Sequence, residues 1–321
     1  MFLKRAQLGN NRWYLYLITI ILVVVGTILG QLPLFFIAIA KGGSSGLEQY
    51  EILEKIEAMD FAGVGMDQNF SVLLMLLSFV VALVFLWVGV KFIHNKPFNV
   101  LINPSLSINW NKIFFAFALW MGFTFFIEFI FYLLEPDIYS FQFDQNKFFV
   151  LLLIAIFIFP LQTSFEELMF RGYLMQGISL LGGQRWLPLL LTSVAFGAMH
   201  FMNPEVEKFG LGLSMTYYIG VGLFLGIITL MDNGLELALG VHAATNIYSA
   251  LFVTFDESAV QTAALFHTSE VNMGWMLFGF FAAALAFIYI VSKKYNWDNW
   301  SNCYGPIETP HTAEEIVLNE E

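Results

Sequence analysis

Six side chains have types and spacings that could do chemistry in an apolar environment. They are Glu166, Glu167, Arg171, His200, His242 and Asn246. The first three follow an uncharged run, FFVLLLIAIFIFP, at 148–160. A carboxylate at the centre of a bilayer costs about 2.5–3.5 kcal/mol on insertion scales, so ionisable residues there usually face the protein interior and act there. We therefore expect these six side chains to form a polar site within a membrane.

The two adjacent glutamates are expected to have different tasks. Neighbouring residues of a helix point about 100° apart, so Glu166 and Glu167 should not share one task. Arg171 follows Glu167 by four residues, which is the order and spacing that favours an ion pair on one helix face. The spacing predicts a structural ion pair of Glu167 with Arg171 and leaves Glu166 free to face a cavity.

Glu166 and His200 are predicted to lie at a similar depth. A helical hairpin that turns at Gly182-Gly183 has Glu166 16 residues before the turn and His200 17 residues after it. Both then lie about 25 Å from the turn, at 1.5 Å per residue. His242 comes only eight residues after the tight turn that MDNG predicts at 231–234. Its depth matches less well, and a common site needs unequal helix lengths or a funnel-shaped cavity.

The elements that must position these residues are membrane helices. The 321 residues are 58% hydrophobic and 12% charged, with a mean hydropathy of +0.72, whereas an ordinary soluble domain is about 45–50% apolar and about 25% charged. A bilayer core takes about 20 apolar residues per helix. The sequence therefore predicts an all-α, multi-pass bundle of about eight transmembrane helices, near 13–40, 70–93, 113–134, 148–170, 186–203, 214–231, 235–254 and 274–292.

The placement of Lys and Arg predicts the orientation. With the N-terminus inside, ten of the 14 basic residues fall on the cytoplasmic side. Both termini are therefore expected in the cytoplasm, and the expected location is the cytoplasmic membrane of a bacterium. The first apolar run is too long for a cleaved signal peptide, so it should remain as the first span, with a bend at Gly26, Gly30 and Pro33.

The chain is expected to divide into four regions. Residues 1–147 hold the N-terminal transmembrane helices with an extramembrane loop near 42–69, and residues 148–254 form the core that carries the six polar residues. Residues 255–300 hold the last transmembrane helix, and residues 301–321 form a disordered polar tail.

The single cysteine, Cys303, excludes a disulfide framework and a cysteine-based zinc cluster. The net charge of −11 comes without a basic stripe, which argues against nucleic acid as a partner. Glu128, a further carboxylate in an apolar run, is expected to be structural.

The motifs resemble those of a known family. EExxxR stands at Glu166 to Arg171, FxxxH at Phe196 to His200 and HxxxN at His242 to Asn246. Three motifs in this order on predicted membrane helices resemble the CAAX proteases and bacteriocin-processing enzymes, also called the Abi or type II CAAX prenyl endopeptidase family. The resemblance covers residues 148–254.

The resemblance implies an intramembrane endopeptidase that cleaves a membrane-associated or lipidated peptide or protein. Glu166 would then act as a general base on water, with His200 to position or co-activate that water. His242 and Asn246, one helical turn apart, would donate hydrogen bonds to the oxyanion of the tetrahedral intermediate. Glu167 belongs to the same catalytic signature.

A metal mechanism stays open beside this one. Catalytic zinc takes three protein ligands, and two His with one Glu is a known set. His200, His242 and Glu166 could supply it, although the sequence holds no HExxH. The cofactor is therefore either none or a divalent metal such as zinc.

Two other classes of function also remain open. A small-solute or proton transporter uses membrane carboxylates and histidines as relays. A non-catalytic membrane scaffold could retain the fold.

Overall fold

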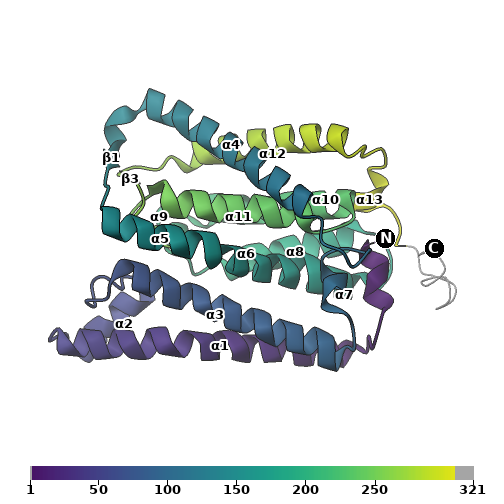
Figure 1. Ribbon diagram of the computed structural model, residues 1–321, viewed down its shortest axis with the longest axis horizontal. Coiled ribbons are helices and arrows are strands. Elements are labelled where there is room, and N and C mark those ends of the chain that lie inside the picture. The colour runs from purple at the N-terminus through teal and green to yellow at the C-terminus, as the bar shows by residue number, and fades with distance from the viewer. Residues whose placement is uncertain (1, 308–321) are drawn as a thin grey trace.

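The computed structural model describes residues 2–307 (Figure 1). Its longer helices are α1 (Trp13–Ser44), α3 (Gln68–Val88), α4 (Trp110–Leu134), α10 (Leu211–Asp232), α11 (Glu236–Leu251) and α12 (Met273–Lys294). A further, nearly continuous helix consists of α5 (Gln145–Phe157), α6 (Phe159–Glu167), a π-helical segment Leu168–Leu174 and α7 (Met175–Ser179). The shorter helices are α2 (Gln49–Glu57), α8 (Trp186–Met199), α9 (Pro204–Phe209) and α13 (Ser301–Tyr304).

Helices occupy all eight positions that the sequence predicts for membrane spans. Six helices of the described chain are long and apolar enough to cross a membrane. The other two are shorter: α8 has 14 residues and α11 has 16. An all-α, multi-pass membrane bundle is confirmed, with six full-length helices and two short ones.

The bundle has α1 and α3 along one side and α4 and α12 along the other, with α6 and α11 between them (Figure 1). The bend expected in the first span does not interrupt it, because α1 is helical without a break from Trp13 to Ser44. Its glycines serve packing instead. A Cβ on Gly30 would lie 2.6 Å from the Cα of Ser78, so this glycine lets α1 and α3 approach closely.

The two ends of the bundle differ. One end, called here the sheet end, carries β1 (Tyr139–Phe141), β3 (Phe266–Thr268) and β2 (Val253–Thr254), in that spatial order. β1 is antiparallel and β2 parallel to β3. The opposite end, called the terminal end, carries the 3₁₀ helix Phe2–Gln7 and α13 (Figure 1).

The segment expected to be a disordered tail begins with ordered structure. Ser301–Tyr304 is helical as α13, and the Ile307 N–H donates to the Gly183 carbonyl. This contact fixes the segment against the turn between α7 and α8. Residues 308–321 of the predicted tail lie outside the described residues.

The turn between α10 and α11 lies inside the bundle rather than at its surface. Leu235 is fully buried, and its N–H donates to the Ile102 carbonyl at 2.8 Å. The side chain of Asn233 accepts from the Phe2 N–H. By contrast, Leu181, at the turn between α7 and α8, is 79% exposed. The recessed turn explains the depth of His242, because α11 begins deeper in the molecule than α8 does.

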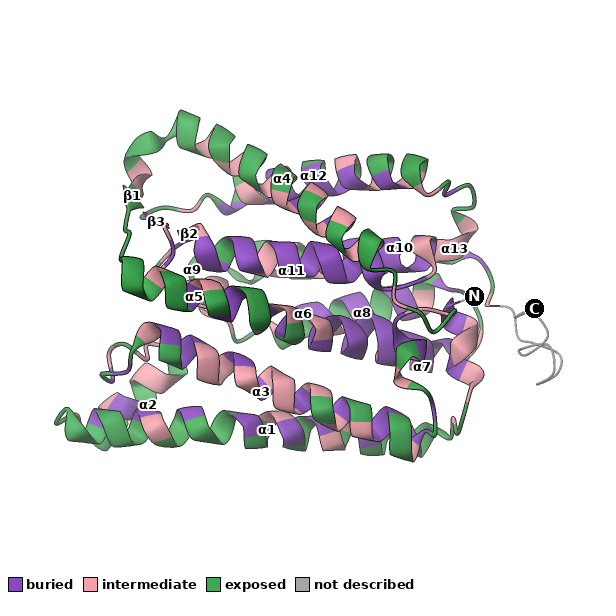
Figure 2. Cartoon of the chain, in the orientation of Figure 1, coloured by how far each residue is buried: buried purple, intermediate pink, exposed green. Residues whose placement is uncertain are grey.

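Helix α11 is the central element (Figure 2). It contacts α4, α5, α6 and α10. All of its residues are buried except Thr245, Asn246 and Ser249. These three polar residues form an uncovered stripe on one face of an otherwise enclosed helix.

Candidate active site

Two irregularities of the α5–α7 helix frame the paired glutamates. Pro160 has no N–H to donate and so favours the break at Ile158, where α5 ends and α6 begins. Glu166 and Glu167 close α6, and the wider π-helical turns of Leu168–Leu174 follow at once. Such π-helical turns frequently occur at functional sites. The glutamates therefore project from a locally irregular helix.

The Glu167 and Arg171 side chains form an ion pair with no exposed surface. Arg171 Nη1 donates to Glu167 Oε1 at 2.8 Å, at the predicted spacing of four residues. Arg171 Nη2 donates to the Gly222 carbonyl at 3.3 Å, and the guanidinium carbon lies 4.3 Å from the centre of the Phe196 ring. Three helices thus hold the arginine in place.

His242 contacts both glutamates, which corrects the expectation that the two carboxylates cannot share a task. Its Nδ1 lies 2.7 Å from Glu167 Oε1 and its Nε2 lies 3.3 Å from Glu166 Oε2. That expectation followed from the geometry of a single helix. The ring comes from α11, and its two nitrogens on opposite edges span carboxylates that point apart.

The two contacts of His242 differ in kind. The contact of Nδ1 with Glu167, at 2.7 Å, is a hydrogen bond that the ring donates, because an ionised carboxylate only accepts. The contact of Nε2 with Glu166, at 3.3 Å, is longer and brings the ring within ion-pair distance of that carboxylate.

Gln162 is a member of the site that the sequence argument missed. Its Nε2 donates to Glu166 Oε1 at 2.7 Å, and its Oε1 accepts from Asn246 Nδ2 at 2.9 Å. It is buried. The available signal was its position, four residues before Glu166 and so on the same helix face. Asn246 reaches the glutamate through this amide and retains a second N–H.

His200 lies beside this cluster at the C-terminal end of α8. Its Nδ1 lies 2.8 Å from the Phe196 carbonyl, so Nδ1 carries the proton and Nε2 of the neutral ring presents a lone pair. The ring stacks on Tyr218, with centres 4.2 Å apart. Phe196 separates the two imidazoles, with its ring centre 4.7 Å from that of His200 and 6.0 Å from that of His242. His200 is within electrostatic range of Glu166.

The arrangement does not fit the zinc set considered above. Both nitrogens of His242 face carboxylates, and His200 Nδ1 faces the Phe196 carbonyl. Of the four imidazole nitrogens, His200 Nε2 is therefore the one that could act as a zinc ligand in this arrangement. No group of three His, Cys, Asp or Glu side chains within residues 2–307 is placed to hold a metal ion.

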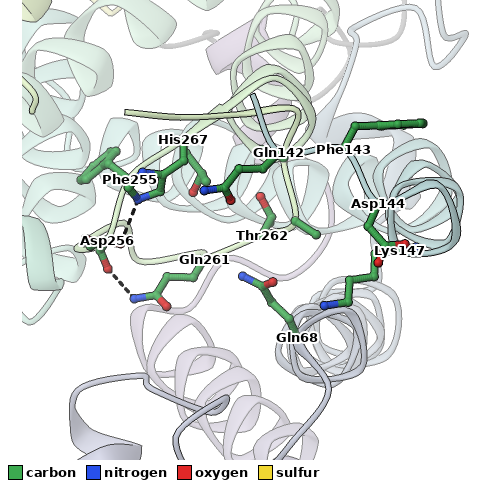
Figure 3. Close-up of a pocket in the computed structure, with 13 residues that line it drawn as sticks. Gln68, Gln142, Phe143, Asp144, Lys147, Phe255, Asp256, Gln261, Thr262 and His267 are labelled. Atoms are coloured by element: carbon green, nitrogen blue, oxygen red, sulfur yellow. Dashed lines mark hydrogen bonds and ion pairs between the residues drawn. The ribbon is translucent and has the colours of Figure 1, made fainter. Parts of the chain in front are cut away.

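A wide polar pocket of about 570 Å³ lies away from these residues (Figure 3). It is at the sheet end, where His267 Nε2 contacts Asp256 Oδ1 at 2.8 Å and Lys147 stands opposite. Lys147 precedes Glu166 by 19 residues, or about 28 Å of helix. The pocket is therefore separate from the glutamate site.

The fold and the site define a polytopic membrane protein with a buried glutamate–histidine–arginine centre. The family model of type II CAAX prenyl endopeptidase Rce1-like proteins matches residues 145–248, which include all of these side chains. The uncharacterized protein YyaK of Bacillus subtilis (strain 168) is 33% identical over 203 residues, covering 63% of this chain and 68% of the relative. No solved structure matches.

The chain belongs to the type II CAAX prenyl endopeptidase Rce1-like family. It is an integral membrane protein of a CAAX-type protease family, which implies a membrane-associated peptide as the substrate.

Proposed function

We propose that this protein is an intramembrane endopeptidase in which Glu166 activates the attacking water. The main support for this role of Glu166 is that side-chain exposure increases along the chain of polar groups from Arg171 to Glu166. Arg171 and Glu167 have no exposed side-chain surface, whereas the side chains of His242 and Glu166 are 7% and 11% exposed. Glu166 is the accessible end of a charge network that is otherwise sealed.

The water lies between Glu166 and His200 in this proposal. Each carboxylate oxygen has two lone pairs, so Glu166 can accept a further hydrogen bond beside the one from Gln162. His200 Nε2 accepts a hydrogen bond from the second O–H of the water, which keeps that proton, and so orients the nucleophile. Glu166 then takes a proton as the water oxygen attacks the peptide carbonyl, and later passes it to the leaving amine.

Asn246 supplies the hydrogen bond to the oxyanion. One of its two N–H groups is held by Gln162, and the other is free to donate to the developing charge. His242 serves instead as a positioning residue, since both of its nitrogens are occupied by Glu166 and Glu167. This differs from the sequence-based expectation, which made His242 a second oxyanion donor.

The substrate reaches the site along the uncovered stripe of α11. Thr245, Asn246 and Ser249 are the residues of this helix that are not fully buried. An extended peptide lying on this stripe meets Asn246 first and Glu166 behind it. The family membership favours this function over the transporter and the scaffold.

Removal of the water-activating pair tests the proposal. Comparing protein termini in a host strain with and without the gene identifies a cleaved peptide, which then serves as the substrate of the purified protein. We expect Glu166→Gln and His200→Ala to abolish cleavage with little change in Tm. Glu54→Gln, an exposed residue of α2, is the control and should keep full activity. Near wild-type turnover by either site variant contradicts the assignment.

Metal removal tests the metal-free form of the mechanism. We expect purified protein treated with a chelator to cleave the peptide at the untreated rate, with substoichiometric metal by elemental analysis. Loss of activity together with one equivalent of zinc, and its return on adding zinc, would instead assign Glu166 and the histidines as ligands.

A further inference from the structure

A second cavity, of about 270 Å³, lies against α11 at Thr245, Tyr248 and Ser249. Its walls come from α4, α11 and α12 and from the loops around β1 and β3, and it is called here the α4–α11–α12 cavity. Aromatic side chains dominate the walls: Trp120, Tyr139, Tyr217, Tyr248, Trp275 and Phe280. A concave, mostly apolar site with few polar groups is the usual form of a small-molecule site.

The charges of this cavity all have one sign. Glu128 lies within it, and Glu135 and Glu270 stand at exposed positions on its rim. Among its lining residues, which all belong to the described chain, there is no Lys, Arg or His. An apolar cleft lined by a single sign of charge concentrates the opposite charge. The cavity therefore favours a cation.

Two polar groups inside the cavity each have an oxygen for which no hydrogen bond is found within the described chain. Glu128 Oε1 accepts from the Tyr139 hydroxyl at 2.7 Å, and its second oxygen makes no bond. The Tyr248 side chain is 95% buried, its hydroxyl makes no hydrogen bond among residues 2–307, and it lies within electrostatic range of Glu128. Both oxygens line the cavity with lone pairs available, so one donor group that enters the cavity can bond to both of them.

We propose that the α4–α11–α12 cavity binds a small amphipathic amine, with its ammonium group at Glu128 and Tyr248 and its apolar body between the aromatic rings. An ammonium has three N–H donors and no acceptor, which matches two acceptors that have no donor. Aromatic faces add attraction for the same cation. None of the residues assigned to catalysis lines the cavity, although Thr245 and Ser249 of the α11 stripe do, so the cavity adjoins the proposed substrate path.

The test measures binding of 4-phenylbutylamine and its neutral analogue 4-phenylbutan-1-ol to the full chain. Isothermal titration calorimetry at pH 7 uses nanodiscs of phosphatidylglycerol, which contain no amine lipid. We expect the amine to bind about tenfold more tightly than the alcohol. Equal affinities for the two probes would overturn the proposal.

Two variants assign the preference to the cavity. Glu128→Gln should bring the amine to the affinity of the alcohol, and Tyr248→Phe, which keeps the ring, should weaken the amine several-fold. Glu57→Gln, on α2 and outside the cavity, should change nothing. If a folded Glu128→Gln protein keeps the preference, or if Tyr248→Phe binds the amine as wild type does, the amine binds elsewhere.

A lipid arm distinguishes a free amine from a lipid headgroup. Replacing part of the phosphatidylglycerol by phosphatidylethanolamine should leave the affinity for 4-phenylbutylamine unchanged. Competitive loss of binding would assign the cavity to the lipid ammonium and overturn the proposal of a small free ligand.

Discussion

Glu167 accepts two hydrogen bonds on one oxygen, from Arg171 and from His242, and its other oxygen has no partner within the described residues. Groups this deeply buried are costly to separate, because breaking a buried ion pair on one side leaves an uncompensated charge. The arginine thus pairs with Glu167, and the same oxygen of Glu167 holds the His242 ring beside Glu166.

This chain of contacts predicts strong coupling between Glu167 and Arg171. Each single change, Glu167→Gln or Arg171→Gln, should cost about 3–5 kcal/mol of stability, because one buried charge is left alone. The double variant should recover part of the loss. Chemical unfolding in detergent measures all four proteins of the cycle, and strictly additive losses would contradict the pair.

The proposed mechanism predicts that Asn246 and Gln162 act together on the reaction. Asn246→Ala should lower kcat by about 100–1,000-fold, as for loss of one oxyanion donor, with little change in KM because the interaction strengthens in the transition state. Gln162→Leu should also lower kcat, since it releases both Glu166 and Asn246. Steady-state kinetics separates kcat from KM. A rise in KM alone would make Asn246 a substrate-binding residue rather than an oxyanion donor.

The motif residues could be found from sequence, but their partners could not. Spacing along one helix placed Arg171 beside Glu167, since four residues make one turn. The contact of His242 with both glutamates depends on how α11 packs against α6, which no spacing within one helix specifies. Gln162 was missed because one amide among apolar residues looks like an ordinary core polar group until Asn246 faces it.

At the scale of elements, α8 and α10 meet through a glycine. A Cβ on Gly222 would lie 2.9 Å from the Cα and the carbonyl oxygen of Ser193, and the Gly222 carbonyl is itself an acceptor for Arg171. Backbone atoms cannot move aside as a flexible side chain can. The close contact of these helices is therefore part of what places the arginine.

Two alanine substitutions on α10 should differ in their effect on Tm and on activity. Gly222→Ala should lower Tm and activity, because it forces α10 away from α8 and from Arg171. Gly212→Ala is the matched control, because its Cβ meets nothing within 4 Å. Alanine is favoured over glycine in a helix interior by about 0.5–1 kcal/mol, so this control should be neutral or stabilising. A Gly222→Ala protein as stable and active as the control would show that the contact is not needed.

The positions of the helices in the sequence could be predicted from hydropathy, whereas the burial of the turn between α10 and α11 could not. Eight apolar segments predicted the bundle, because each needs to bury its backbone polar groups in lipid. The recess of the α10–α11 turn depends on residues 98–103 and Phe2–Gln7, which cover it from outside the membrane segments. Because these covering segments are distant in the sequence, the residues of the turn show no hydrophobic periodicity from which its burial could be predicted.

At the scale of the whole molecule, the N-terminal segment closes the terminal end of the bundle. Lys96, outside the membrane helices, donates from Nζ to the Ala6 carbonyl at 2.7 Å and is 6% exposed. Burial lowers the pKa of Lys96 from 10.5 to about 8. The unfolded chain therefore binds more protons than the folded one between pH 8 and pH 10.5.

Stability should accordingly rise with pH across this window, because the free energy of unfolding increases wherever the unfolded state holds more protons. The rise should be on the order of 2–3 kcal/mol, at 1.36 kcal/mol for each unit of pKa. Thermal melting at pH 8 and pH 10 compares the wild type with Lys96→Met, which should lack this increment. Lys293→Met, an exposed lysine at the end of α12, should keep it. Parallel pH profiles of the wild type and Lys96→Met would contradict a buried, neutralised lysine.

The enclosure of α11 has a consequence for how the protein is made. A helix of 16 residues that carries Glu236, His242 and Asn246 is too short and too polar to partition into lipid as an independent segment. We expect it to enter the bilayer as a hairpin with α10 and then to pack against the helices that are already inserted. The glutamates of α6 precede α11 in the chain, so the centre is complete only once α11 has packed against α6 and α4.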